Sequence, residues 1–483
     1  MQLYNTLSKR IEEVIPINGP QLGLYACGIT AYDYAHIGNL RKYVMDDVLV
    51  RALRYQGFKV THVQNVTDVG HLVSDGDEGE DKIEVGARKY GKSAFEIARE
   101  FEDYFFKASA AIGNLKPDIV ARATDYIADQ INIAKILEEK GYAYIIDGEG
   151  LYFDTSKFPT YGDFANLKLD QQQEGARASK IIGKKNPSDF ALWKFEKPGE
   201  NRAMSWSSPW SERGFPGWHL ECVAISTHFL GAQFDIHTGG IDHIPVHHTN
   251  EIAEAECCSG LSPFVKYWVH HNHMRVEGQK MSKSLGNVYR LEDLEAQGYS
   301  PFALRYLFLT THYRSEFNFT FENLKGAQKT YDRLVHVLHS LKTTHQHSTT
   351  ISHEHIKKIN DYRQEFLNHV YHDLDIPQAL TMISKILKSN LFSEDKYDLI
   401  IEFDEILGLH FRQSAAKLAK KIHDQEAQIN ITPELEDLLK TREQAKKAGN
   451  YAQADQIRQE IISHGYEVED LPNGHSKLKL PNT

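Results

Sequence analysis

The segment QLGLYACGITAYDYAHIGN, residues 21–39, leads from a predicted strand into a predicted helix. Residues 21–27 form the strand candidate, because they are largely apolar and are followed by a glycine turn. Residues 39–56 carry apolar side chains at i, i+4 spacing, which is typical of a helix, and 58–68 supply the next strand candidate. A strand, a helix and a strand joined by a short crossover form a βαβ unit, and such units build parallel sheets.

The segments that follow predict further α/β structure. Residues 70–92 are polar and acidic and predict an exposed loop insertion, whereas 93–141 predict helices. Residues 142–200 alternate short strands and turns, which favours an inserted subdomain. FDIHTGG (234–240) predicts a strand that enters a glycine turn, and IPVHHTNEIAEAECC (244–258) predicts a helix with a proline near its start.

The C-terminal third changes character. Apolar residues between 324 and 341 recur in steps of three and four, which indicates a packed helix, and helical patterns continue to about 424. Residues 433–483 predict one amphipathic helix followed by small strands around a Pro-Asn-Gly turn. We therefore expect an α/β domain over 1–315, a helical bundle over 316–424 and a small α+β module over 425–483.

Composition limits the possible partners and compartments. The 483 residues include 55 Lys and Arg against 66 Asp and Glu, a net charge of −11, which excludes a uniformly basic coat for nucleic acid. Any polyanion must then be bound by local basic patches. Four cysteines are too few for a disulfide scaffold, and no apolar stretch approaches ~18 residues. We expect a soluble protein in a reducing, intracellular compartment.

Two short motifs can bind phosphate. His36-Ile37-Gly38-Asn39 lies at a strand–helix junction, where parallel sheets bind ligands and where a helix N-terminus offers free N–H groups. Gly38 allows a ligand to approach the backbone, and His36 and Asn39 can donate hydrogen bonds. In the second motif, KMSKS (280–284), Lys280 and Lys283 can converge on one triphosphate as mobile point charges.

Together these motifs resemble the HIGH and KMSKS signatures of the class I aminoacyl-tRNA synthetases. The resemblance implies a Rossmann-type catalytic domain in which His36, Asn39, Lys280 and Lys283 hold ATP and stabilise the transition state of adenylate formation electrostatically. The second histidine of the signature is Asn39 here, and an amide cannot become cationic. Adenylation is then slower, or a neighbour such as Arg41 compensates.

A metal site is suggested by four other residues. His247 and Glu251 are four residues apart and share one helix face, while Cys27 and Cys222 add two thiols; such a set suits tetrahedral zinc. The spacing alone also fits a solvated pair on a helix or a zinc hydrolase that uses HxxxE. The rival pair Cys257 and Cys258 is adjacent on a helix, points about 100° apart and chelates poorly, so we interpret it as packing.

Longer motifs narrow the resemblance to the cysteinyl-tRNA synthetase family. These are YACGITAYDYAHIGN, GWHLECVAIS, FDIHTGGIDHIPVHHTNEIAEAE and KMSKSLGN, and the similarity runs from NTLSKR (5–10) to the final module. It implies one Zn²⁺ per chain, held by Cys27, Cys222, His247 and Glu251 beside the amino-acid pocket. Coordination by substrate sulfur would distinguish cysteine from serine and alanine, which shape alone separates by only ~1–3 kcal/mol. We therefore expect no editing domain.

The same resemblance assigns the substrate pockets. It implies a cysteine pocket walled by Gly28, Thr30, Thr67 and Trp218. It implies an ATP site formed by His36, Gly38, Asn39, His237, Gly239, Gly240, Asp242, Lys280 and Lys283, with Asp242 able to hold a ribose hydroxyl. ATP is a substrate, accompanied by Mg²⁺. The family has another glycine where Thr238 stands.

The C-terminal parts resemble the tRNA-binding parts of this family. LDIPQAL (374–380) belongs to the bundle, and REQAKKAGNYAQADQIRQEI with GYEVED belongs to the anticodon-binding module. Basic side chains there can contact phosphates, and Asp455 can accept from a base edge. The candidate tRNA-binding residues are Lys417, Lys420, Lys421, Arg442, Lys446, Lys447, Asp455 and Arg458. The resemblance implies a cytoplasmic monomer that binds no membrane.

The function that the sequence predicts is activation of L-cysteine with ATP, followed by transfer to the 3′-terminal adenosine of tRNA(Cys). Three alternatives stay open at this point. One is a ligase of the same ancestry that passes activated cysteine to an amino sugar, although the C-terminal module argues against it. The others are a weakened paralog that only binds tRNA or regulates, for which Asn39 is the support, and the zinc hydrolase.

Overall fold

The computed structural model describes residues 1–69, 82–167, 181–343, 352–427, 432–470 and 475–480. Two compact units are distinguished, Met1–Tyr331 with His347–Leu409 and Asp332–Gln346 with His410–Thr483. The first contains the predicted sheet and the second the C-terminal module. Among the described residues, every helix is too short or too polar to cross a membrane.

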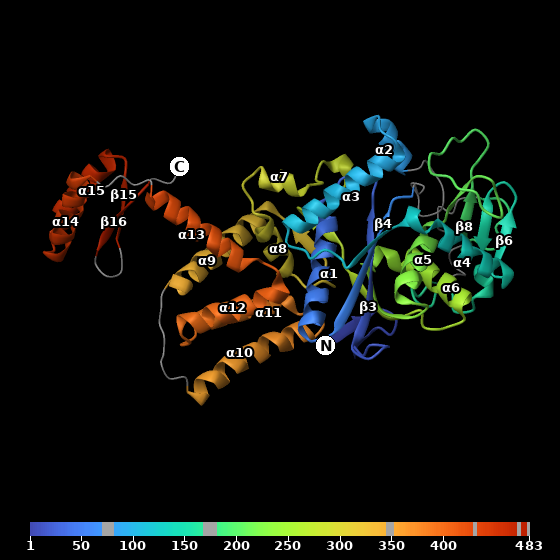
Figure 1. Cartoon of the computed structure of the whole chain (residues 1–483), viewed down its shortest axis with the longest axis horizontal. Coiled ribbons are helices and arrows are strands. Elements are labelled where there is room, and N and C mark those ends of the chain that lie inside the picture. Colours follow the sequence, from blue (N-terminus) through green and yellow to red (C-terminus); the bar gives the residue numbers. More distant parts are fainter. Residues whose placement is uncertain (70–81, 168–180, 344–351, 428–431, 471–474, 481–483) are drawn as a thin grey trace. The chain divides into compact units, whose positions relative to one another are not determined.

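A five-stranded parallel sheet forms the centre of the first unit (Figure 1). Each adjacent pair of its strands is parallel. The strand order is β11 (Val265–His271), β10 (Phe234–Gly240), β3 (Gln21–Thr30), β4 (Lys59–Thr67) and β5 (Ile119–Arg122). Helix α1 (Ile37–Tyr55) crosses over between β3 and β4. The predicted βαβ unit and the α/β class are therefore confirmed.

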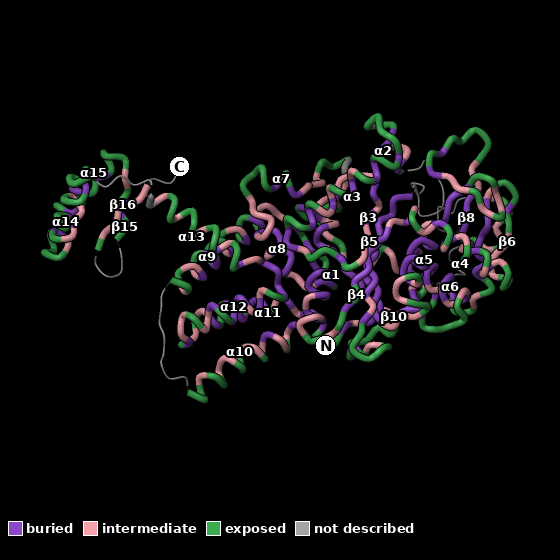
Figure 2. Tube along the Cα trace, viewed as in Figure 1, coloured by how far each residue is buried: buried purple, intermediate pink, exposed green. Residues whose placement is uncertain are grey.

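The strands of this sheet and helix α1 carry the core. Val63 and Val66 of β4 and Val44, Val48 and Leu49 of α1 are fully buried. Figure 2 shows β4 and α1 within a continuous buried region. In β4 every residue from His62 to Thr67 is buried, polar ones included, so both faces of the sheet are covered at its centre.

The segment 93–141 differs from the all-helical prediction, because it contains the edge strand β5 between α3 (Ala94–Ala111) and α4 (Ile127–Glu139). The strand has four residues, too few to establish a period of two along the sequence. Its backbone pairs with β4 from Val63 to Val66. Tertiary pairing with β4, which a local pattern cannot reveal, gives this segment its strand conformation.

The segment 70–92 was predicted to be an exposed loop, and part of that prediction is wrong. Residues 82–90 form helix α2 (Lys82–Tyr90), in which Ile83 is fully buried. The Glu84 carboxylate accepts a hydrogen bond of 2.8 Å from the Ala203 amide. The densest acidic stretch, 75–81, lies outside the described residues.

The segment predicted to be an inserted subdomain supplies three strands of an antiparallel sheet, and the fourth strand lies beyond residue 200. Its strands are β6 (Ala143–Ile146), β7 (Gly150–Phe153), β8 (Phe190–Phe195) and β9 (Gly214–Pro216).

A smaller sheet follows the parallel one along the chain. It consists of β12 (Met274–Val276), β13 (Gln279–Lys280) and β14 (Phe317–Phe319), and it supports the KMSKS segment.

Helices dominate after residue 320, as predicted, and two helices that were not predicted precede them. In the first unit they are α7 (Leu291–Glu295), α8 (Pro301–Leu309), α10 (His353–Tyr371), α11 (Ile376–Leu387) and α12 (Ser393–Leu407). Buried Arg305 of α8 bonds to the Asp47 carboxylate of α1 at 2.5 Å and to the Leu407 carbonyl at 2.7 Å. These bonds join α8 to α1 beside the sheet and to α12.

The second unit contains α13 (Phe411–Ala427), α14 (Pro433–Lys447), α15 (Tyr451–Ser463) and the hairpin β15 (Glu467–Asp470) with β16 (Ser476–Lys479). Helix α9 (Phe321–Thr343) runs from the first unit into it. The single amphipathic helix predicted after 433 is in fact two. Gly449 has a φ of +74°, and Asn450 then caps α15 by accepting from the Gln453 amide.

Candidate active site

Cys27 lies at an irregularity in the central sheet. The pairing of β3 with β4 shifts register between Ala26 and Ile29, so Cys27 and Gly28 form a bulge. A bulge re-aims the side chain that it carries. Cys27 is 4% exposed, and its thiol faces the segments that follow β9 and β10. Gly28 is required here, since an added Cβ would lie 1.5 Å from the Asn65 carbonyl oxygen.

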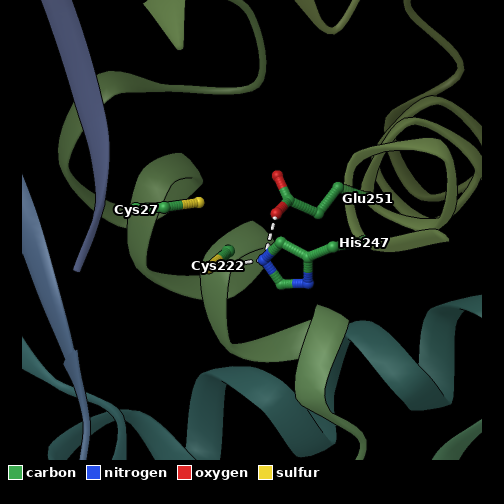
Figure 3. A group of neighbouring side chains, drawn as sticks. All are labelled: Cys27, Cys222, His247 and Glu251. Carbon is green, nitrogen blue, oxygen red and sulfur yellow. Dashed lines mark hydrogen bonds and ion pairs between the residues drawn. The ribbon is translucent and has the colours of Figure 1, made fainter. Parts of the chain in front are cut away.

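The other three predicted ligands converge on this thiol (Figure 3). Cys222 projects from α5 (Trp218–Leu230), His247 from the π-helical turn η5 (Ile244–His248), and Glu251 from the first turn of α6 (Thr249–Ser259). The four donor atoms lie within 4.8 Å of one another, and all four residues are buried. His247 Nε2 lies 2.8 Å from Glu251 Oε1 and 3.5 Å from Cys222 Sγ. The sequence prediction that these residues meet is therefore confirmed.

The two thiols of the cluster differ, because the hydrogen bond with Cys27 and burial raise the pKa of Cys222 well above its ordinary value. Burial alone would raise the pKa of Glu251, but His237 and His247 outweigh it and hold the pKa at about 2. Burial likewise opposes ionisation of Cys27, but Cys222 and the neighbouring imidazoles hold its pKa well below the ordinary value. Burial alone would lower the pKa of His247, but the nearby Glu251 outweighs this effect and raises the pKa to about 10. A divalent cation could replace the His247 proton in balancing the carboxylate and the thiolate.

A layer of aromatic and imidazole rings surrounds the donors. Trp218 stacks on His247 with ring centroids 4.3 Å apart, and His219 Nδ1 lies 2.9 Å from His247 Nδ1. His248 approaches Cys27 Sγ at 3.4 Å and His270 at 2.7 Å. Outer-layer partners of this kind fix the orientation of ligands. The sequence interpretation missed these histidines, although two of them adjoin predicted site residues.

His237 differs from its predicted place on the ATP side. It is fully buried, its Nε2 lies 2.8 Å from Glu251 Oε2, and its ring stacks on Trp268. In this structure it therefore orients a carboxylate. With His248 it also completes a second set of close donors that shares Cys27 and Glu251 with the first.

The remaining cysteines have the packing role that was predicted. Cys257 belongs to the core behind the cluster and Cys258 packs against it, and neither is in a donor set found among the described residues. Burial raises the pKa of Cys257 to about 12, so its thiol stays protonated at neutral pH.

The first phosphate motif is built as a helix cap. His36 Nδ1 accepts from the Asn39 amide at 3.2 Å, and Asn39 Oδ1 accepts from the His36 amide at 3.1 Å. This capping box leaves His36 Nε2 and Asn39 Nδ2 as the donors for a ligand. Burial lowers the pKa of His36, which keeps the ring neutral at neutral pH.

The KMSKS segment lies against this cap although it is about 240 residues away in sequence. The Ile37 amide donates to the Tyr289 carbonyl at 2.9 Å, and an added Cβ on Gly38 would lie 3.2 Å from Met281 Cε. Asn287 shapes the loop, since its side chain accepts from the Ser282 amide and donates to the Lys280 carbonyl. Lys280 is exposed, whereas the Lys283 side chain lies outside the described residues.

Arg41 cannot compensate for Asn39, and that suggestion is wrong. The side chain is 2% exposed and donates to the carbonyl oxygens of Asn272, His312 and Ser315 at 2.8, 3.3 and 3.2 Å. Burial lowers its pKa to about 10, so it stays charged at neutral pH. Its charge is used to join α1 to the segments around 272 and 314.

The predicted pocket residues are carried mainly by strands β3, β4 and β10. Thr67 is buried at the end of β4, and Thr30 pairs with it. Gly239 admits no side chain, because an added Cβ would lie 2.5 Å from His248 Cε1. The exposed Asp242 carboxylate folds over Gly240.

The predicted tRNA contacts differ in their exposure. Arg442 is 3% exposed, and its guanidinium bonds to Asp470 and Ser476, so its charge is balanced inside the module. Lys446 also pairs with Asp470, at 2.8 Å. The other residues are exposed: Lys417, Lys420, Lys421, Lys447, Asp455 and Arg458.

Comparison with known families shows what this chain is similar to. The class I (C) catalytic domain of tRNA synthetases matches residues 13–329, and the cysteinyl-tRNA ligase anticodon binding domain matches 430–475. A cysteine–tRNA ligase of Burkholderia lata is 42% identical over 475 residues, which cover 98% of this chain and 96% of the relative. The cysteine–tRNA ligase of Treponema denticola is 39% identical, with 99% and 100% covered.

Solved structures match in fold. The LeuRS of Agrobacterium radiobacter, in a ternary complex with tRNA, aligns with a TM-score of 0.60 over 83% of this chain and 85% of the other, at 12% identity. Mycobacterium tuberculosis methionyl-tRNA synthetase aligns with a TM-score of 0.55 over 84% and 93%, at 14% identity. At these identities the likeness concerns the fold alone, and it supports the Rossmann-type class predicted for the catalytic domain.

Proposed function

The chain belongs to the cysteine–tRNA ligase family, and we propose that Cys27, Cys222, His247 and Glu251 hold one zinc ion that selects its substrate. The protein is a class I aminoacyl-tRNA synthetase whose substrates are L-cysteine, ATP and tRNA(Cys). The observation that carries the zinc proposal is the buried set of four donors within 4.8 Å of one another.

The reaction has two steps. In the first, a carboxylate oxygen of cysteine attacks the α-phosphorus of ATP, and the bond to pyrophosphate breaks. In the second, a ribose hydroxyl of the 3′-terminal adenosine attacks the carbonyl carbon of the adenylate, and AMP leaves. Neither step needs an oxidant or a covalent enzyme intermediate, so the protein contributes mainly positioning and charge.

The phosphate-binding roles follow from the helix cap and the loop packed against it. His36 Nε2 and Asn39 Nδ2 donate to phosphate oxygens at the positive end of α1, and Gly38 leaves room for the backbone to approach. Lys280 and Lys283 neutralise charge that develops on the pyrophosphate. Gly239, Gly240 and Asp242 bind the adenosine side, and Mg²⁺ accompanies the triphosphate.

The donor set suits zinc, since two thiolates, one imidazole and one carboxylate are ligands that it accepts. When bound, zinc would supply a Lewis acid to which a thiol coordinates much more strongly than a hydroxyl does. Gly28, Thr30, Thr67 and Trp218 wall the pocket in which the substrate side chain meets this site. Discrimination of this kind makes a separate editing domain unnecessary.

The tRNA is bound by the C-terminal parts. The three-part division at 1–315, 316–424 and 425–483 describes activation, support of the tRNA and anticodon binding. Exposed Lys417, Lys420 and Lys421 are suited to phosphate contacts, which weaken as salt rises. Arg442 contributes by holding the module together. We expect a monomer that works in the cytoplasm.

The test is to measure cysteine-dependent ATP–pyrophosphate exchange, charging of tRNA(Cys) and metal content on one preparation. We expect one zinc per chain, exchange and charging. Exchange without charging would favour the amino-sugar ligase, and neither activity would favour the weakened paralog. Cysteine activation that survives complete removal of zinc would overturn the zinc mechanism.

A further inference from the structure

The bulge that carries Cys27 is held by side chains on both of its sides. A bulged residue leaves the regular ladder, so its backbone groups need other partners. The Gly28 amide donates to Asn65 Oδ1 at 2.6 Å. Asn65 in turn donates from Nδ2 to Thr67 Oγ1 at 3.1 Å, so the β4 side of the bulge is joined to the predicted cysteine pocket.

On the other side, a charged group from α1 binds the bulge. The Lys42 ammonium donates a short hydrogen bond to the Cys27 carbonyl oxygen, and the Tyr43 hydroxyl lies 3.4 Å from the same oxygen. The Lys42 ammonium also forms an ion pair of 2.9 Å with Asp46, one helical turn further along. His271, the last residue of β11, holds Asp46 Oδ1 with its Nε2 at 2.8 Å.

Burying these charged groups costs desolvation free energy. The side chains of Lys42, Asp46 and His271 are 15%, 2% and 2% exposed. Burial alone would raise the pKa of Asp46, but Lys42 and His271 outweigh it and keep the pKa below its ordinary value. A buried pair often stabilises a protein less than apolar residues of the same volume would, so its retention calls for another role.

We propose that Lys42, fixed by Asp46 and His271, is a positioning residue that aims the Cys27 sulfur at the metal site. By holding the Cys27 carbonyl on the α1 side, it prevents the bulge from relaxing into the ladder with β4, which would turn the side chain. The inference rests on the proposed zinc site and names a residue that touches neither the metal nor the substrate.

Helix α1 offers a matched control. Arg51 and Asp47 form a second i, i+4 ion pair at 2.7 Å, with side-chain exposures of 12% and 3%, close to those of Lys42 and Asp46. Arg51 bonds to the carbonyls of Gly113 and Glu405 instead of the bulge. Arg51→Met therefore removes a comparable ion pair from the same helix without touching Cys27.

The experiment compares Lys42→Met, Lys42→Arg, Asp46→Asn and Arg51→Met with the wild-type chain. The first measurement is the rate at which bound zinc is released to a coloured chelator. Loss of an outer-layer partner typically costs about 10–100-fold in metal affinity, so we expect Lys42→Met to release zinc at least about 10-fold faster. Asp46→Asn should change the rate in the same direction, whereas Lys42→Arg should stay within about threefold.

The second measurement is ATP–pyrophosphate exchange. Lys42→Met should raise KM for cysteine about 10-fold while KM for ATP changes less than about twofold. Thermal unfolding reports general destabilisation, which Arg51→Met should share while it releases zinc at the wild-type rate. Zinc release from Lys42→Met and Asp46→Asn at the rate of Arg51→Met would overturn the proposal. A wild-type chain that binds no zinc would instead overturn the proposed metal site.

Discussion

The proposed metal cluster and the proposed phosphate motifs are built in opposite ways. Cys27, Cys222, His247 and Glu251 are at most 4% exposed and already contact one another. The phosphate motifs have a half-buried cap and an exposed lysine loop. A side chain as small as that of cysteine offers little shape, so its recognition needs donors fixed in advance. A triphosphate carries several charges, and mobile cations can gather around it when it binds.

The largest effect is expected from Cys222→Ala. Removing one of four ligands should release the metal and lower cysteine activation at least about 10³-fold, because the loss of a metal–sulfur contact is worth several kcal/mol. The measurements are zinc content and ATP–pyrophosphate exchange. Cys257→Ala, a substitution of another buried cysteine, should keep its zinc. Activity in a zinc-free Cys222→Ala enzyme would show that cysteine recognition does not need the fixed donors of the metal cluster.

Lys280→Ala should affect the phosphate motifs and leave the metal cluster unchanged. We expect exchange to fall about 10²-fold, the usual consequence of losing one group that stabilises transition-state charge, with zinc content and melting temperature unchanged. Lys325→Ala, at another exposed lysine, serves as the control. A Lys280→Ala enzyme that loses zinc would show that the two regions are not independent.

Two substitutions of Asn39 can distinguish its role in capping α1 from its role in binding phosphate. Asn39→Ala should lower exchange about 10-fold, since a hydrogen bond to a charged group contributes about 1.5 kcal/mol. Asn39→Asp keeps an oxygen for the His36 amide and suits a helix N-terminus, so its melting temperature should not fall. Its exchange rate should nevertheless be lower than that of Asn39→Ala, because a carboxylate repels phosphate. Equal rates for the two variants would limit Asn39 to a structural role.

The smallest effect on activity is expected from Glu254→Gln. Glu254 is fully buried behind the metal cluster, neither carboxyl oxygen has a hydrogen-bond partner among the described residues, and burial raises its pKa well above the ordinary value. The folded chain therefore keeps a proton that the unfolded chain loses above about pH 4.5. Its stability should fall as pH rises, by up to about 1.4 kcal/mol per pH unit.

Glu254→Gln removes this proton linkage with little change of shape. The variant should be more stable than the wild type at pH 8, and the difference should shrink toward pH 5. Thermal unfolding across this range measures the effect, and exchange at pH 7 should change less than about twofold. Parallel stability curves for the two proteins would show that the carboxyl is solvated or paired after all.

The sequence allowed the βαβ unit, the helix that follows His247 and the proximity of four possible metal ligands to be predicted, because each depends on a local period or on a specific motif. The edge strand β5 and helix α2 were missed. The four residues of β5 become a strand only by pairing with β4, and α2 was hidden in an acidic segment. The contacts of Arg41 and His237 could not be predicted either, since each side chain bonds to segments that are distant in sequence.

The metal cluster also has a consequence during synthesis. Cys27 leaves the ribosome about 220 residues before Glu251, the last of its partners. At about 5–20 residues per second, the thiol waits on the order of 10–45 s for the segments that will enclose it. During that interval it is an ordinary cysteine on a nascent chain, open to oxidants and to stray metal ions. We therefore expect the active fraction of newly made chains to fall when synthesis proceeds under oxidising conditions.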